Sequence, residues 1–299
     1  MEIGTQYKRD DKTDKSGFLR KARFHQSKFR AEYLKSPCDK YGNYLTQEDA
    51  KNGLNFFEGF EIFEAVQNFS KYKKALYANL LRSEHIPFNL FIPLDKDKEY
   101  AKMVFIEILG QEISSIDRIE IEYAPKPKKD YLNDATAFDA YIEYSLPNYS
   151  KGIIGIEVKY TEREYPLKAN SKEDKEINDL TSPYFRVTEN CGLFKPNSTP
   201  QLISNKFRQV WRNHILGESI LLKDRTNFSK VTSITLFPKA NKHFVKTNAD
   251  YQNLLIKNDN NFIGLTFEKL FEILENHSPN NKYTDWVKYL NSRYIVTEK

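Results

Sequence analysis

The chain has 299 residues, of which 39% are hydrophobic and 29% charged, and its 46 lysines and arginines exceed its 41 acidic residues by five. It is long enough to bury a sizeable core, and no apolar run reaches the length of a transmembrane helix, so we expect no membrane association. Only two cysteines, Cys38 and Cys191, are present, which excludes a disulfide framework or a cysteine-based zinc site and predicts a cytoplasmic protein.

The N-terminal part, residues 1–68, is predicted to be a helical extension packed on a larger domain of residues 69–299. Its polar first residues lack the pattern of a secretory signal. Basic and aromatic residues then alternate between Arg20 and Lys35, which indicates an amphipathic helix that buries its aromatic side chains. The basic side of this helix is expected to be solvated, although it also suits a nucleic-acid backbone.

Helical spacing continues after this segment. Thr46 is the predicted N-cap of a helix that ends at Gly53, and apolar residues then recur at helical intervals as far as Glu84. We expect a break between Asn68 and Lys71, so that the second of the two helices carries Glu84 toward the functional site. A capping or surface role for Glu84 is the alternative.

A helix over Lys98 to Leu109 precedes a predicted strand over Asp117 to Tyr123. In this strand apolar side chains alternate with charged ones, among them Glu122, so the two kinds are expected on opposite faces. The lysine-rich connection from Pro125 to Asp134 is predicted to be exposed and leads directly into the next strand.

Two strongly apolar strands follow, Phe138 to Tyr144 and Ile153 to Tyr160, joined by turn-forming residues. Because strand side chains alternate, Asp139 projects from the first strand, and Glu157 and Lys159 project together from the second. A hairpin folded symmetrically about the middle of the connection sets residue 139 opposite residue 157. This register predicts that two carboxylates and a lysine meet.

Two carboxylates and a lysine suit metal-dependent hydrolysis of phosphodiester bonds. Carboxylate oxygens are preferred ligands of Mg²⁺, which acidifies a bound water, and a lysine can stabilise the charge that develops on the phosphate. A solvated strand face is the simpler interpretation of the same spacing. The apolar residues around Glu157 favour the functional interpretation, because a charge on such a strand is costly unless it has a partner or a task.

Residues 163–198 are predicted to form a long loop with a short helix around Lys172 to Leu180, and loops of this length are often functional. Thr199 and Pro200 then begin a helix that is expected to run to about Lys223. Its apolar side should be buried. Its polar side presents candidate contacts to the site or to a substrate, namely Gln201, Gln209 and Arg212.

Two strands, Lys230 to Phe237 and Phe262 to Thr266, complete the predicted sheet. The helices Phe267 to His277 and Tyr283 to Tyr294 end the chain, and Thr284 is the expected cap of the second. From the helix before the first strand onward, the predicted order is one helix, three strands, one helix and one strand.

The order Asp139, then Glu157, Val158 and Lys159, resembles the signature of the PD-(D/E)XK nuclease superfamily. Asp139 lacks the preceding proline that is usual there. Five segments also resemble a bacterial restriction-endonuclease-like family of this superfamily: FRAEYL at 29–34, GLNFFEGFEIFEAV at 53–66, LLRSEHIPFNLFIPL at 80–94, IGIEVKYTE at 154–162 and QVWRNHILGESIL at 209–221. Within the third segment, a serine and a glutamine are missing from the positions where the family pattern has them.

The resemblance implies an α/β (α+β) fold with a restriction-endonuclease-like αβββαβ core and a mixed sheet flanked by helices. It also implies that Mg²⁺, or Mn²⁺ in its place, is held by Asp139, Glu157 and the backbone carbonyl of Val158, with Lys159 as the catalytic lysine. Further contacts to the site or substrate are expected from Glu84, Glu122, Glu162, Gln201, Gln209 and Arg212.

Two functions fit these residues. The first is an Mg²⁺-dependent DNA endonuclease of restriction or anti-phage defence, which acts as a homodimer or with a protein partner, since one site per chain favours a dimer for double-strand cleavage. The alternative is a non-catalytic nuclease fold that binds nucleic acid or serves as a scaffold in a defence complex. The intact set of two acids and a lysine favours the enzyme.

Overall fold

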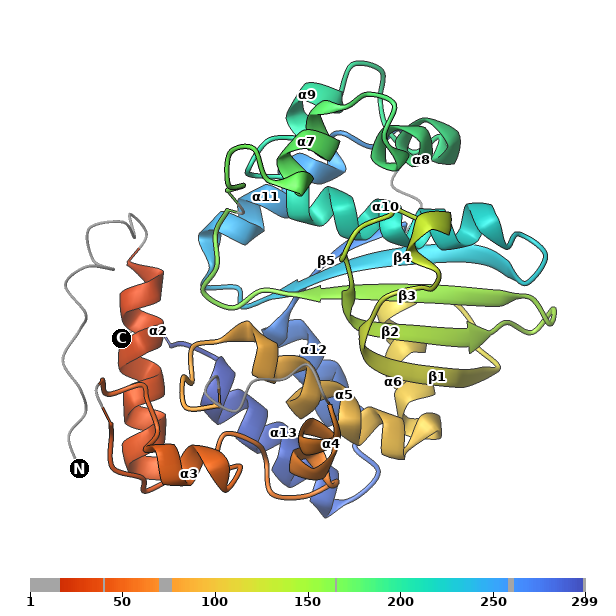
Figure 1. Ribbon diagram of the computed structural model, residues 1–299. Helices are drawn as coiled ribbons and strands as arrows, with labels where there is room; N and C mark the ends of the chain where they lie inside the picture. Colours follow the sequence, from red (N-terminus) through yellow and green to blue (C-terminus); the bar gives the residue numbers. More distant parts are fainter. Residues whose placement is uncertain (1–16, 40, 70–76, 165, 258–260, 298–299) are drawn as a thin grey trace.

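A mixed sheet of five strands forms the centre of the protein, which the computed structural model describes for residues 17–39, 41–69, 77–164, 166–257 and 261–297. The strands lie side by side in chain order (Figure 1). The first three are antiparallel neighbours, whereas the third, fourth and fifth run parallel. Their bounds are β1 Ser115–Tyr123, β2 Phe138–Ser145, β3 Lys151–Val158, β4 Phe228–Phe237 and β5 Phe262–Thr266.

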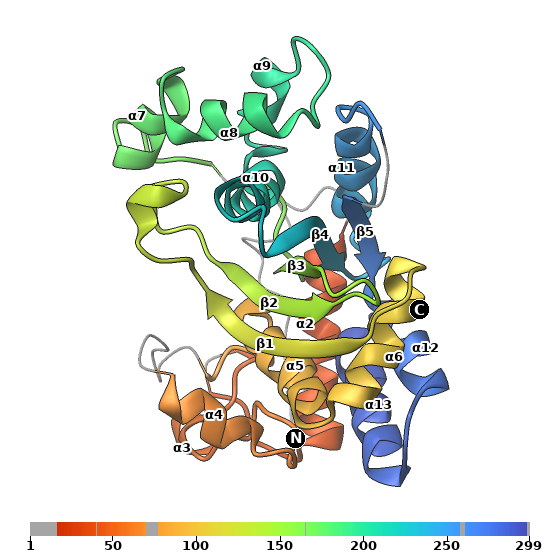
Figure 2. The same cartoon turned by 90° about the vertical axis from the view of Figure 1, so that its right-hand side faces the viewer.

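Helices cover both faces of the sheet, as the two views in Figures 1 and 2 show. One face carries α10 (Arg208–Lys223) and α11 (Lys242–Gln252), with α7 (Lys172–Asn178), α8 (Pro183–Cys191) and α9 (Thr199–Leu202) beyond α10. The other face carries α5 (Ile86–Lys96), α6 (Lys98–Leu109), α12 (Phe267–Asn276) and α13 (Asn281–Tyr294). The predicted αβββαβ order and the mixed sheet flanked by helices are confirmed.

The N-terminal helices lie on the side of the sheet that carries α5 and α13. They are α2 (Phe18–Lys28), which continues into a π-helical turn (Phe29–Tyr33), α3 (Gln47–Lys51) and α4 (Ile62–Asn68). The predicted cap of α3 is confirmed, because the Asp49 N–H donates to Thr46 Oγ1 at 3.1 Å. Apolar side chains of this part join the same core as α5 and α13. The domain boundary at residue 68 stays a prediction.

The predicted hairpin forms with the expected register. Ser145 pairs with Lys151 and Ala140 with Ile156, so continuation of the ladder places residue 139 opposite residue 157. The Phe138 ring packs closely on β3, since a Cβ on Gly155 would lie 2.3 Å from a ring carbon of Phe138. The α10 helix crosses over between β3 and β4, and such a connection makes these two strands parallel.

The prediction of one long helix from Thr199 to Lys223 is wrong, because the chain leaves helical geometry between α9 and α10. Arg208 is buried at the start of α10, where its guanidinium donates to the Ile203 carbonyl oxygen at 2.7 Å. The break separates Gln201 on α9 from Gln209 on α10. The two glutamines therefore do not share one helical face.

Three other helices were wrongly predicted or missed. Part of the helix expected to end near Glu84 lies outside the described residues, and residues 77–82 form turns, so the helix of this region is α5, with Pro87 in its first turn. The α8 and α11 helices lie where no helix was expected.

Asn280, rather than Thr284, caps α13, because its side chain accepts from the Lys282 and Tyr283 N–H groups. Within the described part of the chain, no helix has the length and apolar character needed to cross a bilayer.

Candidate active site

Three acidic side chains lie in a row across β1, β2 and β3. The residue pairs Ile121–Ala140 and Tyr123–Phe138 flank Glu122 and Asp139, so these two acids lie opposite each other. The β2–β3 register places Asp139 opposite Glu157. Glu122 has a φ of 55°, an uncommon value for a residue other than glycine, which interrupts the regular strand at this point. All three carboxylates line one cavity of about 230 Å³, which Ala135, Thr136, Ala137, Gln209, Arg212 and Asn213 complete.

Asp139 is held against the end of β3. Its Oδ2 accepts a hydrogen bond of 2.6 Å from the Val158 N–H. Burial raises the pKa of Asp139 well above its ordinary value, and the Glu157 carboxylate raises it further. Lys159 and the hydrogen bond from the Val158 N–H lower this pKa in part. Two like charges on one cavity are therefore only partly compensated by the protein.

Glu157 is 5% exposed and has a donor at each oxygen. Lys159 Nζ lies 2.5 Å from Oε1, and the Gln209 amide also donates to Oε1 at 2.5 Å. The Asn213 amide donates to Oε2. Gln209 and Asn213 are four residues apart on α10 and so face the same way. The helix thereby fixes the position of the carboxylate from above the sheet.

Lys159 is as deeply buried as Glu157. Burial by itself lowers the pKa of the Lys159 ammonium, but the carboxylates of Glu157, Glu162 and Asp139 outweigh burial and raise this pKa above its usual value. The lysine is therefore a cation at neutral pH. A fixed positive charge at this place can stabilise an anion that enters the neighbouring cavity.

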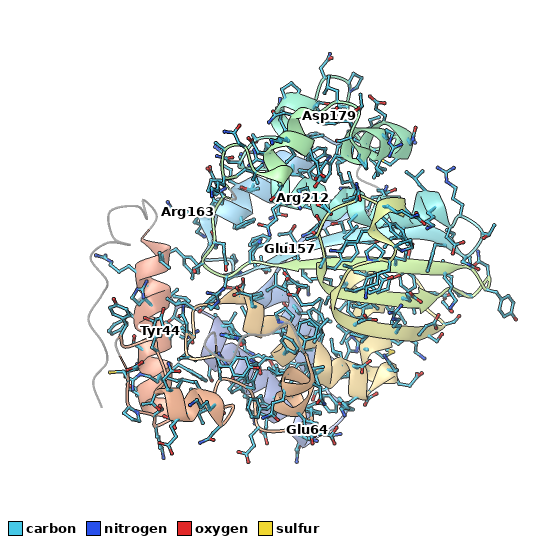
Figure 3. The ribbon with its side chains drawn as sticks, in the orientation of Figure 1. Tyr44, Glu64, Glu157, Arg163, Asp179 and Arg212 are labelled. Atoms are coloured by element: carbon cyan, nitrogen blue, oxygen red, sulfur yellow. The ribbon has the colours of Figure 1, made fainter. Side chains whose placement is uncertain are left out.

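Arg212 flanks the cavity from α10, above Glu157 (Figure 3). Its Nη2 donates to Asp134 Oδ2 at 2.6 Å and to Thr136 Oγ1 at 2.7 Å, and its Nη1 donates to the Glu173 carboxylate on α7. The Asp134 carboxylate also accepts from the Tyr184 hydroxyl at 2.5 Å. Arg212 therefore joins α7, α8 and the segment before β2 at the edge of the site.

The remaining candidates lie outside the cavity. Glu162 accepts from the Ser83 hydroxyl at 2.6 Å and from the Tyr160 N–H at 2.7 Å, so it supports the segment that follows Lys159. Glu84, in a 3₁₀ turn before α5, pairs with Arg82 rather than with the acidic row. Gln201 is exposed on α9. Of these three, only Glu162 is electrostatically coupled to the site residues, through Lys159.

Asn213 is the site residue that the sequence analysis missed. Its position four residues after Gln209 was a usable signal, because both lie on one side of a helix. Asparagine at this position was not assigned to either side of the predicted helix. The structure shows that Asn213 is 4% exposed and bonded to Glu157.

The acidic pair fits a divalent cation. Among the described residues, no group of three or more histidine, cysteine, aspartate or glutamate side chains is arranged to hold a metal ion. Asp139 and Glu157 nevertheless offer hard oxygen donors to one cavity. Burial and, after it, the Glu157 carboxylate raise the pKa of Asp139, and a cation between the two acids would offset both effects. The role of the Val158 carbonyl stays a prediction.

Glu218, further along α10, supports a prediction about stability. It is 5% exposed, and burial raises its pKa from 4.5 to about 7, partly opposed by Arg225. At pH values between 4.5 and about 7, Glu218 keeps its proton in the folded protein and releases it in the unfolded chain. The free energy of unfolding therefore falls as the pH rises through this window. We expect Glu218→Gln to remove this fall, which amounts to about 3 kcal/mol.

Urea unfolding of wild type and Glu218→Gln at about pH 5 and about pH 8 measures the effect. The exposed Glu189, substituted to glutamine, is the control and should keep the pH dependence of the wild type. A Glu218→Gln protein that loses as much stability as wild type between the two pH values would contradict the prediction.

A family model described as the PD-(D/E)XK nuclease superfamily matches residues 10–296. Searches of the curated proteins and of the solved structures gave no match. The matched residues include the acidic row, the lysine and α10.

Proposed function

Because the chain belongs to the PD-(D/E)XK nuclease superfamily, we propose that it is an Mg²⁺-dependent DNA endonuclease that uses Asp139, Glu157 and Lys159. Proteins of this superfamily are generally nucleases, which hydrolyse phosphodiester bonds. The observation that carries the proposal is the meeting of Asp139, Glu157 and Lys159 at one end of the sheet, from two strands in the predicted register.

Each residue of the site has a task in this reaction. Asp139 and Glu157 would hold Mg²⁺, which supplies a Lewis acid and an acidified water when it is bound. Gln209 and Asn213 keep the Glu157 carboxylate in place, so little reorganisation is needed on binding. The Lys159 ammonium is set to stabilise negative charge on the phosphate.

Incubation of supercoiled plasmid DNA with the protein and Mg²⁺ tests the proposal. We expect nicked or linear DNA from wild type, no cleavage in EDTA, and a loss of at least about a hundredfold in rate for the isosteric Asp139→Asn variant. Glu120→Gln, on the exposed side of β1, is the matched control and should cleave like wild type. The proposal fails if wild type leaves methylated and unmethylated DNA intact.

DNA as the substrate, a cytoplasmic location and a role in restriction or anti-phage defence are part of the proposal. The cytoplasmic location rests on the two cysteines, and the other two rest on the resemblance of the five sequence segments to restriction-endonuclease-like proteins. The same resemblance motivates a homodimer or a protein partner, since a single site per chain cuts one strand at a time. Protection of cells against phage by wild type, and its loss in Asp139→Asn, would support the defence role.

A second candidate is a nuclease fold that binds nucleic acid without cleaving it. The observation in its favour is that both carboxylates already have donors from the protein, including an ammonium and two amides on Glu157. This candidate predicts that Asp139→Asn and wild type bind DNA equally and protect cells equally. The first candidate predicts equal binding and loss of protection.

A further inference from the structure

Arg212 lies between two cavities. One is the cavity of the acidic row, and the other, of about 410 Å³, is lined by Lys128, Asn133, Asp134, Ala135, Glu173, Glu176 and Arg212. The two cavities share Ala135 and Arg212. A ligand that extends from the acidic row into the second cavity must therefore pass the guanidinium group of Arg212.

The two carboxylates that bind Arg212 are held very differently. The Asp134 side chain is 10% exposed and also accepts from the Tyr184 hydroxyl at 2.5 Å and from the Thr136 N–H at 3.0 Å. The Glu173 side chain is 26% exposed and accepts a hydrogen bond from Arg212 Nη1. Asp134 is thus a fixed partner of Nη2, whereas Glu173 is the partner that solvent or a ligand can replace at Nη1.

The helix that carries Glu173 is short. The α7 helix has seven residues, and Ile177 is the buried side chain among those described. Its N-cap bond from the Asp174 N–H to Ser171 is local and does not attach it to the rest of the protein. The ion pair between Glu173 and Arg212 attaches α7 to the edge of the site.

We propose that Arg212 Nη1 is a binding site for a phosphate of the nucleic-acid chain, and that Glu173 fills this site in the free protein. A guanidinium N–H group donates to a phosphate oxygen as it does to a carboxylate oxygen, so the Glu173 carboxylate at Nη1 stands in for the phosphate. The second cavity would receive the nucleotide next to the scissile bond, with the exposed Lys128 at its wall. This inference rests on the proposed function.

Displacement of Glu173 has a cost that weakens binding. The apparent affinity for nucleic acid is the intrinsic affinity multiplied by the fraction of molecules in which Arg212 has released Glu173. The Glu173 carboxylate on α7 therefore lowers the apparent affinity of the Arg212 site for a phosphate. Only a polyanion that also gains contacts at the acidic row and at Lys128 displaces this carboxylate. The ion pair favours long nucleic acids over single phosphate-containing molecules.

The test is binding of short fluorescein-labelled DNA, both duplex and single-stranded, measured in EDTA by fluorescence anisotropy. We expect Glu173→Gln to tighten binding by about tenfold because the competing carboxylate is gone. Glu176→Gln removes the same charge from the same helix and the same cavity, and it should tighten binding far less. Arg212→Ala should weaken binding, and in the Arg212→Ala background Glu173→Gln should have no further effect.

Hydrogen exchange gives a second readout that does not depend on affinity. Amide exchange in residues 172–178 should become faster in Glu173→Gln, and equally fast in wild type when DNA is saturating. A thermal melt confirms that each variant is folded. Equal tightening by Glu173→Gln and Glu176→Gln, persistence of the Glu173 effect without Arg212, or no binding of DNA by any variant would each overturn the inference.

These experiments are separate from the test of cleavage. Binding and exchange are measured in EDTA, so a protein that cleaves nothing can still show displacement of Glu173 by DNA. Conversely, a protein that cleaves plasmid DNA but shows the same affinity in wild type and Glu173→Gln remains a nuclease, and the role of Glu173 is then rejected.

Discussion

Asp139→Ala and Glu157→Ala are expected to lose both Mg²⁺ binding and cleavage, whereas Lys159→Ala should bind Mg²⁺ at least as tightly as wild type and cleave about a hundredfold to ten-thousandfold more slowly. The acids would be ligands, so each deletion removes an oxygen donor from the cavity. The lysine competes with a cation for Glu157 through the 2.5 Å ion pair. Its removal frees the carboxylate but removes the charge that stabilises the phosphate.

Calorimetric titration of Mg²⁺ or Mn²⁺ into each variant, beside single-turnover cleavage of plasmid DNA, separates the two classes. Glu120→Ala, which removes an acid that pairs with Arg118 outside the cavity, is the control and should change neither quantity. If Glu157→Ala binds the ion as tightly as wild type while Lys159→Ala cleaves normally, the hairpin is only a charged face of the sheet and the active site lies elsewhere.

The hairpin was predictable because its information is local. Alternation with period two fixes which side chains share a face, and turn residues near Asn148 fix the register, so the position of Asp139 opposite residue 157 follows from a short segment. The strand β5 and its following helix were predictable for the same reason, since Thr266 is both the last strand residue and the cap of α12.

The parts that could not be predicted depend on contacts between distant residues. The Arg212–Asp134 ion pair joins positions 78 apart, and nothing in either segment identifies the other as its partner. The end of α9 is set by tertiary packing, because a helix start at Thr199 and Pro200 gave no signal that the helix would stop after one turn. Tertiary context here overrides a local preference for helix.

The helical extension depends on a buried cation, which gives the largest expected effect on stability. Arg293 of α13 is fully buried, and its guanidinium donates to the backbone and side-chain oxygens of Asn55 and to the Tyr289 hydroxyl. The aromatic ring of Tyr294 lies 4.9 Å from its central carbon. These described acceptors are neutral oxygens, so the charge is balanced by oriented dipoles and aromatic faces rather than by a carboxylate.

Arg293→Met keeps most of the volume of the side chain and removes all its donors. The Asn55 backbone oxygen keeps the Asn89 amide as a donor, but Asn55 Oδ1 and the Tyr289 hydroxyl lose the donors from Arg293. A buried polar group that loses its donor costs about 1–3 kcal/mol, so we expect a total loss of about 2–5 kcal/mol of unfolding free energy. Arg293→Lys should lose a similar amount, because one ammonium group cannot reproduce the planar fork that reaches Asn55 and Tyr289 together.

Urea unfolding measures the loss, and Arg20→Met on the exposed side of α2 is the control, with an expected change below about 0.5 kcal/mol. The effect should reach the active site as well. Gln26 donates to the Arg293 carbonyl oxygen at 2.6 Å and to the Tyr160 hydroxyl at 2.8 Å, and Tyr160 directly follows Lys159. Cleavage by Arg293→Met should therefore weaken under conditions where the protein is still folded. An Arg293→Met protein with the stability and activity of wild type would show that the extension contributes nothing to the position of the lysine.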